Sequence, residues 1–157
     1  MERSDVPLVR TVRHREARRG REDKTVNPSR AEIEQLITIL AKAFGLDVAA
    51  SLRQCEKESS FNCEAHNPVS DAYGLFQLEA PAARQMGVDR KDPAENVFGG
   101  LKYMRWLKEM FGSDDKAYAA YNWGPGNLHN LIVKQGDEWR ACLPPETSKY
   151  VSFILGD

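Results

Sequence analysis

Glu58 is the residue of this sequence whose type and surroundings best suit proton transfer. It opens the segment Glu58-Ser59-Ser60-Phe61 and follows residues 48–55, whose apolar side chains recur at helical spacing. A carboxylate at a helix C-terminus faces the negative end of the dipole, and burial beside Phe61 raises its pKa further. A carboxyl group protonated near neutral pH can act as a general acid at a glycosidic oxygen. The alternative is a solvated surface glutamate in a Glu-Lys-Glu run.

A second carboxylate is what most glycoside hydrolases require. Four acidic residues lie near Glu58 in sequence, namely Glu56, Glu64, Asp71 and Glu79. None of them stands in a motif that marks it as a partner. A hydrolase would use Asp71 or Glu64 to activate water, and that alternative stays open.

Five short motifs follow one another in order between about residues 40 and 155. They are Glu58-Ser-x-Phe, Gly74-Leu-x-Gln77, Asn96-x-x-Gly99-x-x-x-Tyr103, Ala120-Tyr121-Asn122-x-Gly124-Pro125-Gly126 and Pro145-x-Thr147-x-x-Tyr150-Val151. In this order they resemble the soluble lytic transglycosylases, lysozyme-like enzymes of glycoside hydrolase family 23 that cleave peptidoglycan. Each motif alone is weak, whereas five in one order form a specific signal.

The resemblance implies non-hydrolytic cleavage of the β-glycosidic bond between N-acetylmuramic acid and N-acetylglucosamine. Glu58 would protonate the glycosidic oxygen and then, as a carboxylate, take the proton of the muramic acid 6-hydroxyl. That hydroxyl would close a 1,6-anhydro ring, so that a single carboxyl group serves as acid and base. No cofactor is implied, and the expected partner is the peptidoglycan glycan strand.

The same resemblance implies supporting roles for residues around Glu58. Tyr121 matches a tyrosine near the catalytic carboxyl and is expected to orient Glu58 by hydrogen bonding. Gln77 would bind sugar substituents at the cleavage point. Phe76 would either cover a sugar face or pack in the core.

Three further residues have two interpretations each. Ser59 would bond a glycan group or the backbone at the helix end. Asn122 would contact sugar or fix the start of a loop. Trp123 would stack on a sugar ring or pack against the protein.

Helical periodicity, caps and breakers predict the elements that position these residues. About seven helices are expected, over residues 29–44, 47–58, 80–86, 92–111, 114–121, 128–133 and 144–154. Ser29 with Glu32 forms a capping box, and Asp92 caps the longest helix. Residues 74–78 read as a short strand on local propensity. The fold class is mainly α, and the resemblance implies a goose-type lysozyme-like domain with a cleft.

Charge separates the chain into two parts. Residues 1–30 carry a net charge of +4, against −1 for the whole chain. Residues 1–27 are predicted to form a flexible basic arm, and residues 28–157 the catalytic domain. The apolar core of a signal peptide and a membrane-spanning run are both missing from the sequence, so the export route to the periplasm or cell wall stays open. A monomer is expected, and a phage or secretion-apparatus partner would explain delivery.

Three cysteines and three histidines complete the inventory of reactive side chains. Cys55 and Cys63 flank Glu58 and would close a small loop in an oxidising compartment, or remain buried thiols. Cys142 is expected in the core. The histidines are scattered and form no ligand pattern with the cysteines, so no metal is expected.

Two other classes of function stay open. A peptidoglycan-binding module would keep the fold without activity. A nucleic-acid binder would use the basic arm, although only its charge composition favours this and no nucleic acid is expected as a partner.

Overall fold

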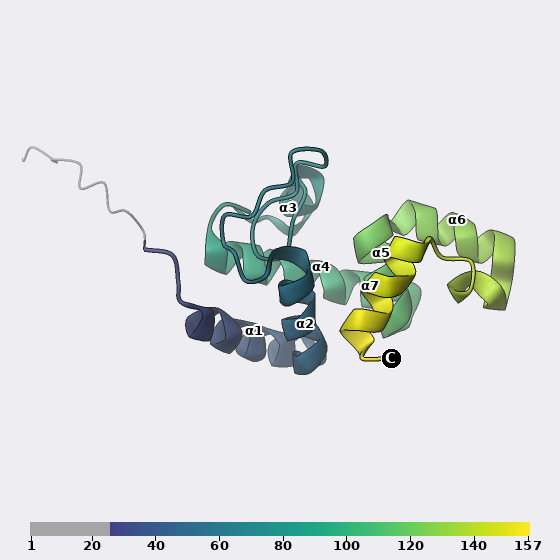
Figure 1. The fold of residues 1–157 in the computed structure, drawn as a ribbon, viewed down its shortest axis with the longest axis horizontal. Helices are drawn as coiled ribbons and strands as arrows, with labels where there is room; N and C mark the ends of the chain where they lie inside the picture. The colour runs from purple at the N-terminus through teal and green to yellow at the C-terminus, as the bar shows by residue number, and fades with distance from the viewer. Residues whose placement is uncertain (1–25) are drawn as a thin grey trace, which may run out of the picture.

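The computed structural model describes residues 26–157, which form seven α-helices and one short 3-10 helix (Figure 1). They are α1 (Arg30–Phe44), α2 (Val48–Ser59), α3 (Ala80–Met86), α4 (Pro93–Phe111), α5 (Asp114–Trp123), α6 (Pro125–Gln135), η1 (Gly136–Arg140) and α7 (Pro145–Leu155). No strand is formed within these residues, so the prediction of a mainly α fold is confirmed. The basic arm expected over residues 1–27 lies almost wholly outside the described part.

The helix starts follow the local chemistry of the sequence. The Ser29 hydroxyl accepts from the amide of Glu32, whose carboxylate accepts from the amide of Ser29 in return, which completes the predicted capping box. Asp47 and Asp92 accept amide hydrogen bonds at the starts of α2 and α4. These caps satisfy orphan donors and fix where each helix begins.

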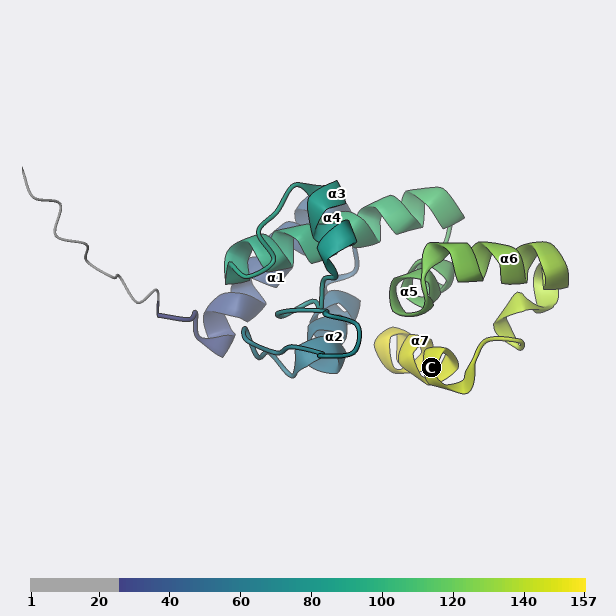
Figure 2. The same ribbon diagram turned by 90° about the horizontal axis from the view of Figure 1, so that it is seen from above.

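Helix α4 connects two groups of helices. It packs against α1 and α3 and also against α5, and α5 in turn packs against α6 and α7 (Figure 2). Helix α2 closes the arrangement because it contacts both α1 and α7. As a result, residues near position 58 lie beside residues near position 150.

One apolar core runs through the junction of these helices. Many of its fully buried members come from α1, α4, α5 and α7, and they include Ile37, Leu101, Leu107, Ala117, Val151 and Ile154. Burial of this apolar surface supplies the main driving force for the helix arrangement.

The segment between α2 and α3, residues 60–79, contains no regular element and is called the cleft loop below. The short strand predicted over residues 74–78 is wrong. Tyr73 and Leu78 exchange two backbone hydrogen bonds, each of 3.0 Å, and the chain between them turns back on itself. Gly74 and Gln77 make this turn with φ angles of 80° and 47°, which an extended strand does not allow.

Candidate active site

Glu58 lies in the last turn of α2, as the sequence predicts, and its side chain is partly buried. Burial raises the pKa of its carboxyl group to about 7, against opposing effects of a hydrogen bond from Tyr150 and the charge of Lys57. The carboxyl group therefore exchanges its proton near neutral pH. This is the property that a single acid and base needs.

Tyr150 is the hydrogen-bond partner of the candidate acid. Its hydroxyl donates to Oε1 of Glu58 over 2.5 Å, from α7 to α2. Arg53, one turn earlier on α2, donates to the carbonyl of Ile154 over 2.6 Å and ties the same two helices together. The sequence motifs included Tyr150 but gave it no role, because its partner lies 92 positions away in the chain.

Tyr121 does not hydrogen-bond to Glu58, so the predicted contact is wrong. Its hydroxyl donates to the backbone carbonyl of Phe76 over 2.6 Å. The two groups are nevertheless neighbours: burial first, and then the charge of Glu58, raise the pKa of Tyr121 well above its usual value. Tyr121 thus connects the helix that carries it to the cleft loop beside the carboxyl group.

Phe76 is fully buried, and the expectation that it covers a sugar face is therefore wrong. Its ring lies against α4 where Gly100 leaves room: a Cβ on that glycine would come within 2.5 Å of the ring. The backbone of Phe76 is held from both sides, because its amide donates to Asn96 and its carbonyl accepts from Tyr121. The structure shows the other interpretation of Phe76, in which the ring packs in the core.

Gln77 and Ser59 both use their side chains to brace the backbone. The Nε2 group of Gln77 donates to the carbonyls of Ala65 and Gly74, each over 2.9 Å. The hydroxyl of Ser59 donates to the carbonyl of Leu75 over 2.9 Å, which ties the end of α2 to the cleft loop. The sequence allowed two interpretations of Ser59, and the structure shows the hydrogen bond to the backbone.

A hollow of about 260 Å³, called the cleft below, collects several of the predicted residues. Its lining comes from the cleft loop, α3, α4 and the turn from α5 to α6, and includes Gln77, Tyr103, Tyr121, Asn122, Trp123 and Pro125. Asn122 is exposed, while Trp123 and Tyr121 are half-buried. Their polar and aromatic surfaces suit a carbohydrate, which needs hydrogen bonds at its edges and an apolar face beneath its rings.

Asp71 and Glu64 are the carboxylates that a hydrolase would recruit, and both are exposed. Asp71 is engaged elsewhere, 2.9 Å from the His66 ring and 2.7 Å from the Arg90 guanidinium group. His66 first, and then Arg90, lower the pKa of the Asp71 carboxyl. A carboxylate whose pKa is lowered by two such partners is a weak base for activating water.

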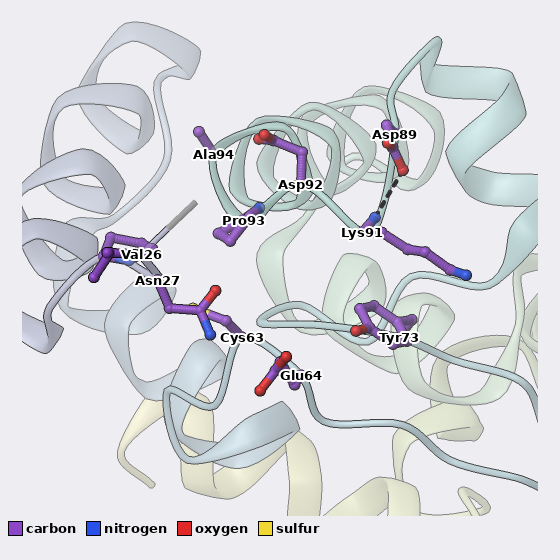
Figure 3. A pocket seen from close by; sticks show the side chains of 11 residues that line it. Val26, Asn27, Cys63, Glu64, Tyr73, Asp89, Lys91, Asp92, Pro93 and Ala94 are labelled. Carbon is purple, nitrogen blue, oxygen red and sulfur yellow. Dashed lines mark hydrogen bonds between the residues drawn. The ribbon is translucent and has the colours of Figure 1, made fainter. Parts of the chain in front are cut away.

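Glu64 lines a separate and larger hollow of about 590 Å³ at the start of α4 (Figure 3). Tyr73, Asp89 and Asp92 border the same hollow, and none of its lining residues borders the cleft. The volume of a hollow therefore does not identify the candidate active site in this protein. The identification depends on the residues around Glu58 and the cleft.

The remaining predictions on reactive side chains have mixed outcomes. Cys55 and Cys63 are buried free thiols, and burial raises the pKa of Cys55 to about 12. Cys142 is exposed, so its expected place in the core is wrong. Within residues 26–157, no three metal-ligating side chains come together. None of the helices described here has both the length and the apolar character that a bilayer span requires.

Comparison with known proteins assigns the chain to a family. The family model described as the transglycosylase SLT domain matches residues 35–141, well over half of the chain. The chain belongs to this family. Relatives in it include the membrane-bound lytic murein transglycosylase F of Cellvibrio japonicus, which is 37% identical over 103 residues. That match covers 59% of this chain but 20% of the relative.

Other family members agree with this placement. The membrane-bound lytic murein transglycosylase F 1 of Alkalilimnicola ehrlichii is 30% identical over 115 residues, which cover 64% of this chain and 23% of the relative. The chain thus spans about a fifth of the length of such relatives.

Solved structures share the fold. The lytic transglycosylase Slt of Pseudomonas aeruginosa, solved as an inactive mutant, matches with a TM-score of 0.67 and 26% identity over 77% of this chain and 22% of that one. The 70-kDa soluble lytic transglycosylase of Escherichia coli gives a TM-score of 0.68 at 21% identity, with the same coverage, which supports the fold alone.

Proposed function

We propose that this chain is the catalytic domain of a peptidoglycan lytic transglycosylase. The observation that carries the proposal is the partly buried Glu58 with its pKa near 7, hydrogen-bonded by Tyr150. Its charge raises the pKa of Tyr121, which lines the cleft. The names of the relatives support it, since they are called lytic murein transglycosylases. The substrate would be the glycan strand of peptidoglycan, and the site of action the periplasm or cell wall.

In the first step, protonated Glu58 transfers its proton to the oxygen that joins N-acetylmuramic acid to N-acetylglucosamine. The bond from this oxygen to the anomeric carbon breaks, and its electron pair stays with the departing N-acetylglucosamine as a hydroxyl group. The N-acetyl group of the muramic acid stabilises the positive charge at the anomeric carbon. A carboxyl group with a pKa near 7 is protonated often enough to start this step at neutral pH.

In the second step, the Glu58 carboxylate takes the proton of the muramic acid 6-hydroxyl. The oxygen of that hydroxyl attacks the anomeric carbon and closes the 1,6-anhydro ring, and Glu58 returns to its protonated form. No water is consumed. The attacking group belongs to the same sugar, so its high effective concentration favours ring closure over hydrolysis.

The cleft residues would bind the glycan around this bond. Asn122 is exposed and offers hydrogen bonds, and the half-buried ring of Trp123 offers a stacking face. Gln77 commits its Nε2 to the loop, so its Oε1 is the atom that would meet a sugar hydroxyl. Tyr121 would act as a positioning residue, because its hydroxyl fixes the carbonyl of Phe76.

The decisive experiment is mass spectrometry of the products released from purified peptidoglycan, with Glu58→Gln as the matched control. Muropeptides lighter by one water than hydrolysis products, and resistant to borohydride reduction, are expected from the native chain. The rate of Glu58→Gln should be lower by about 10²-fold to 10⁴-fold, which is the usual contribution of a general acid and base to the rate. Reducible muramic acid ends would instead indicate a hydrolase, and binding without any product would indicate a non-catalytic module.

A further inference from the structure

Gln54 is a buried polar side chain at a position where an apolar side chain would pack at least as well. It lies on α2 one turn before Glu58, on the same face of the helix, and is fully buried. Its Nε2 lies 3.4 Å from the hydroxyl oxygen of Tyr150. Its Oε1 has no hydrogen-bond partner among residues 26–157. A buried amide oxygen without a partner destabilises the fold, so an apolar side chain of equal size would suit the packing better.

The contact with Tyr150 indicates what Gln54 does in the site. A tyrosine hydroxyl has one proton to donate, and here it goes to Oε1 of Glu58. The oxygen of that hydroxyl is then an acceptor, and the donor that faces it is the amide nitrogen of Gln54. The side chains form a directed series in which each N–H or O–H points toward the carboxyl group.

We infer that Gln54 is a positioning residue that keeps the Tyr150 proton directed at Glu58, an inference that rests on the proposed function of Glu58 as the acid and base. Hydrogen bonds in such a series polarise one another, so the amide strengthens the donor that acts on the carboxylate. The ionised form of Glu58, which accepts the proton of the 6-hydroxyl, is the form that this series favours.

Other charged and titratable groups around Glu58 do not replace this series. From α2, Lys57 acts on the carboxyl through its charge alone, and Cys55 carries a neutral thiol. From α5, Tyr121 directs its hydroxyl to a backbone carbonyl. Tyr150 on α7 is therefore the group that donates to the carboxyl group, and Gln54 is the residue behind it.

Gln54→Met tests the inference, because methionine keeps the volume and removes both amide groups. The readout is the titration of the Glu58 carboxyl carbon by NMR in protein labelled with ¹³C at glutamate Cδ, with Glu58→Gln used to assign its signal. The midpoint should move upward by roughly 0.5 in pH, the equivalent of one modest hydrogen bond. The melting temperature should stay unchanged or rise, since the unpartnered oxygen is gone.

Two controls make the result specific. Gln85→Met makes the same chemical change at an exposed position of α3 and should leave the titration unchanged. In a Tyr150→Phe background the hydroxyl is absent, so Gln54→Met should cause no further shift. A lowered melting temperature with an unchanged titration would make Gln54 a structural residue and overturn the inference, as would an equal shift in the Tyr150→Phe background.

Activity provides the second readout. In Gln54→Met, the fall of kcat/KM at alkaline pH should move upward with the Glu58 titration, because loss of the acid form sets that limb. If the native chain releases no product, the proposed function fails, while the NMR titration still tests the link from Gln54 to Glu58. If the native chain is active and the titration of Gln54→Met is unchanged, the inference alone fails.

Discussion

The carboxyl group and the loop that follows it are held by two different kinds of structure. Gln54, Glu58 and Tyr150, called the carboxylate cluster, stand on two regular helices that pack against each other. The cleft loop has no regular element, and four of its residues other than glycine have positive φ angles: Ser60, Phe61, Asp71 and Gln77. Each such residue costs conformational energy, so the loop depends on hydrogen bonds from outside to keep its shape.

One buried side chain supplies two of those external hydrogen bonds, to the backbone of Tyr73 and Phe76. Asn96 is fully buried on α4, and its amide donates to the carbonyls of Tyr73 and Arg90 while its oxygen accepts from the amide of Phe76. All three bonds measure 2.8 Å. The carboxylate cluster, by contrast, gains its geometry from helix packing. The comparison predicts that the two regions can be damaged separately.

The largest effect is expected from Asn96→Ala. The Phe76 amide and the Arg90 carbonyl would lose their partner, whereas the Tyr73 carbonyl would keep the amide of Leu78. At about 1 to 3 kcal/mol for each of the two groups, the loss of stability should be about 2 to 6 kcal/mol. Urea denaturation measures it, with Asn130→Ala on the exposed face of α6 as the control. The Glu58 titration should be retained in Asn96→Ala under conditions where the variant is folded. A changed titration would mean that the two regions are not independent.

The next largest effect is on the free energy of unfolding, which should depend on pH because the Glu58 carboxyl group is buried. Its folded pKa of about 7 lies above the ordinary value of 4.5, so the folded state binds the proton more tightly than the unfolded chain. The contribution of Glu58 to stability should therefore be greatest below pH 4.5, fall as the pH rises toward 7, and level off above it. The total fall expected from this group is about 3 kcal/mol.

Glu58→Gln should remove that fall, because glutamine carries no charge to bury. At pH 8 the variant should be more stable than the native chain by about 2 to 3 kcal/mol, although it is inactive. Chemical denaturation at pH 5 and pH 8 measures the difference. Equal pH dependence in both proteins would contradict the burial of Glu58 on which the assignment depends.

A smaller effect is expected from Tyr121→Phe, which removes the bond between α5 and the cleft loop. The lost hydrogen bond to the Phe76 carbonyl should cost about 1 kcal/mol of stability. Turnover should fall without disappearing, since the loop shifts while the carboxylate cluster stays intact. Kinetics together with the Glu58 titration check this: slower turnover at an unchanged titration is expected. A loss as large as that of Glu58→Gln would make Tyr121 a catalytic residue.

The helices that carry the carboxylate cluster were predicted well from the sequence. Periodicity and caps found the helices, and the position of Glu58 at the end of α2 followed from them. These signals are local, and they act over one or two turns. The Tyr150 bond spans 92 positions and the Asn96 bonds span up to 23, so no local pattern could indicate them.

The cleft loop was where the sequence was misleading. An apolar segment after glycine suggested a strand, yet Phe76 turns into the core against Gly100. Hydrophobicity alone does not tell a ring that faces a sugar from one that faces the core. The residues Asn122 and Trp123 beside the cleft remain predictions for sugar contact.

The smallest effect is expected from Asp71→Asn, and it separates the two enzymatic alternatives. Asp71 is exposed and its pKa is lowered, by His66 first and then by Arg90, so its contribution to stability is present above the unfolded pKa and lost as the pH falls through the folded one. Its ion pairs lie at the surface, where such pairs contribute little.

For a transglycosylase, Asp71→Asn should therefore leave the products unchanged and turnover within about twofold, because only a hydrolase needs this carboxylate. Arg90 still donates to the carbonyls of Asp71 and Leu78 in this variant, so the cleft loop keeps its anchor. Product analysis beside Glu64→Gln gives the matched comparison. A loss of activity in Asp71→Asn, with the Glu58 titration retained, would move the second catalytic role into the cleft loop.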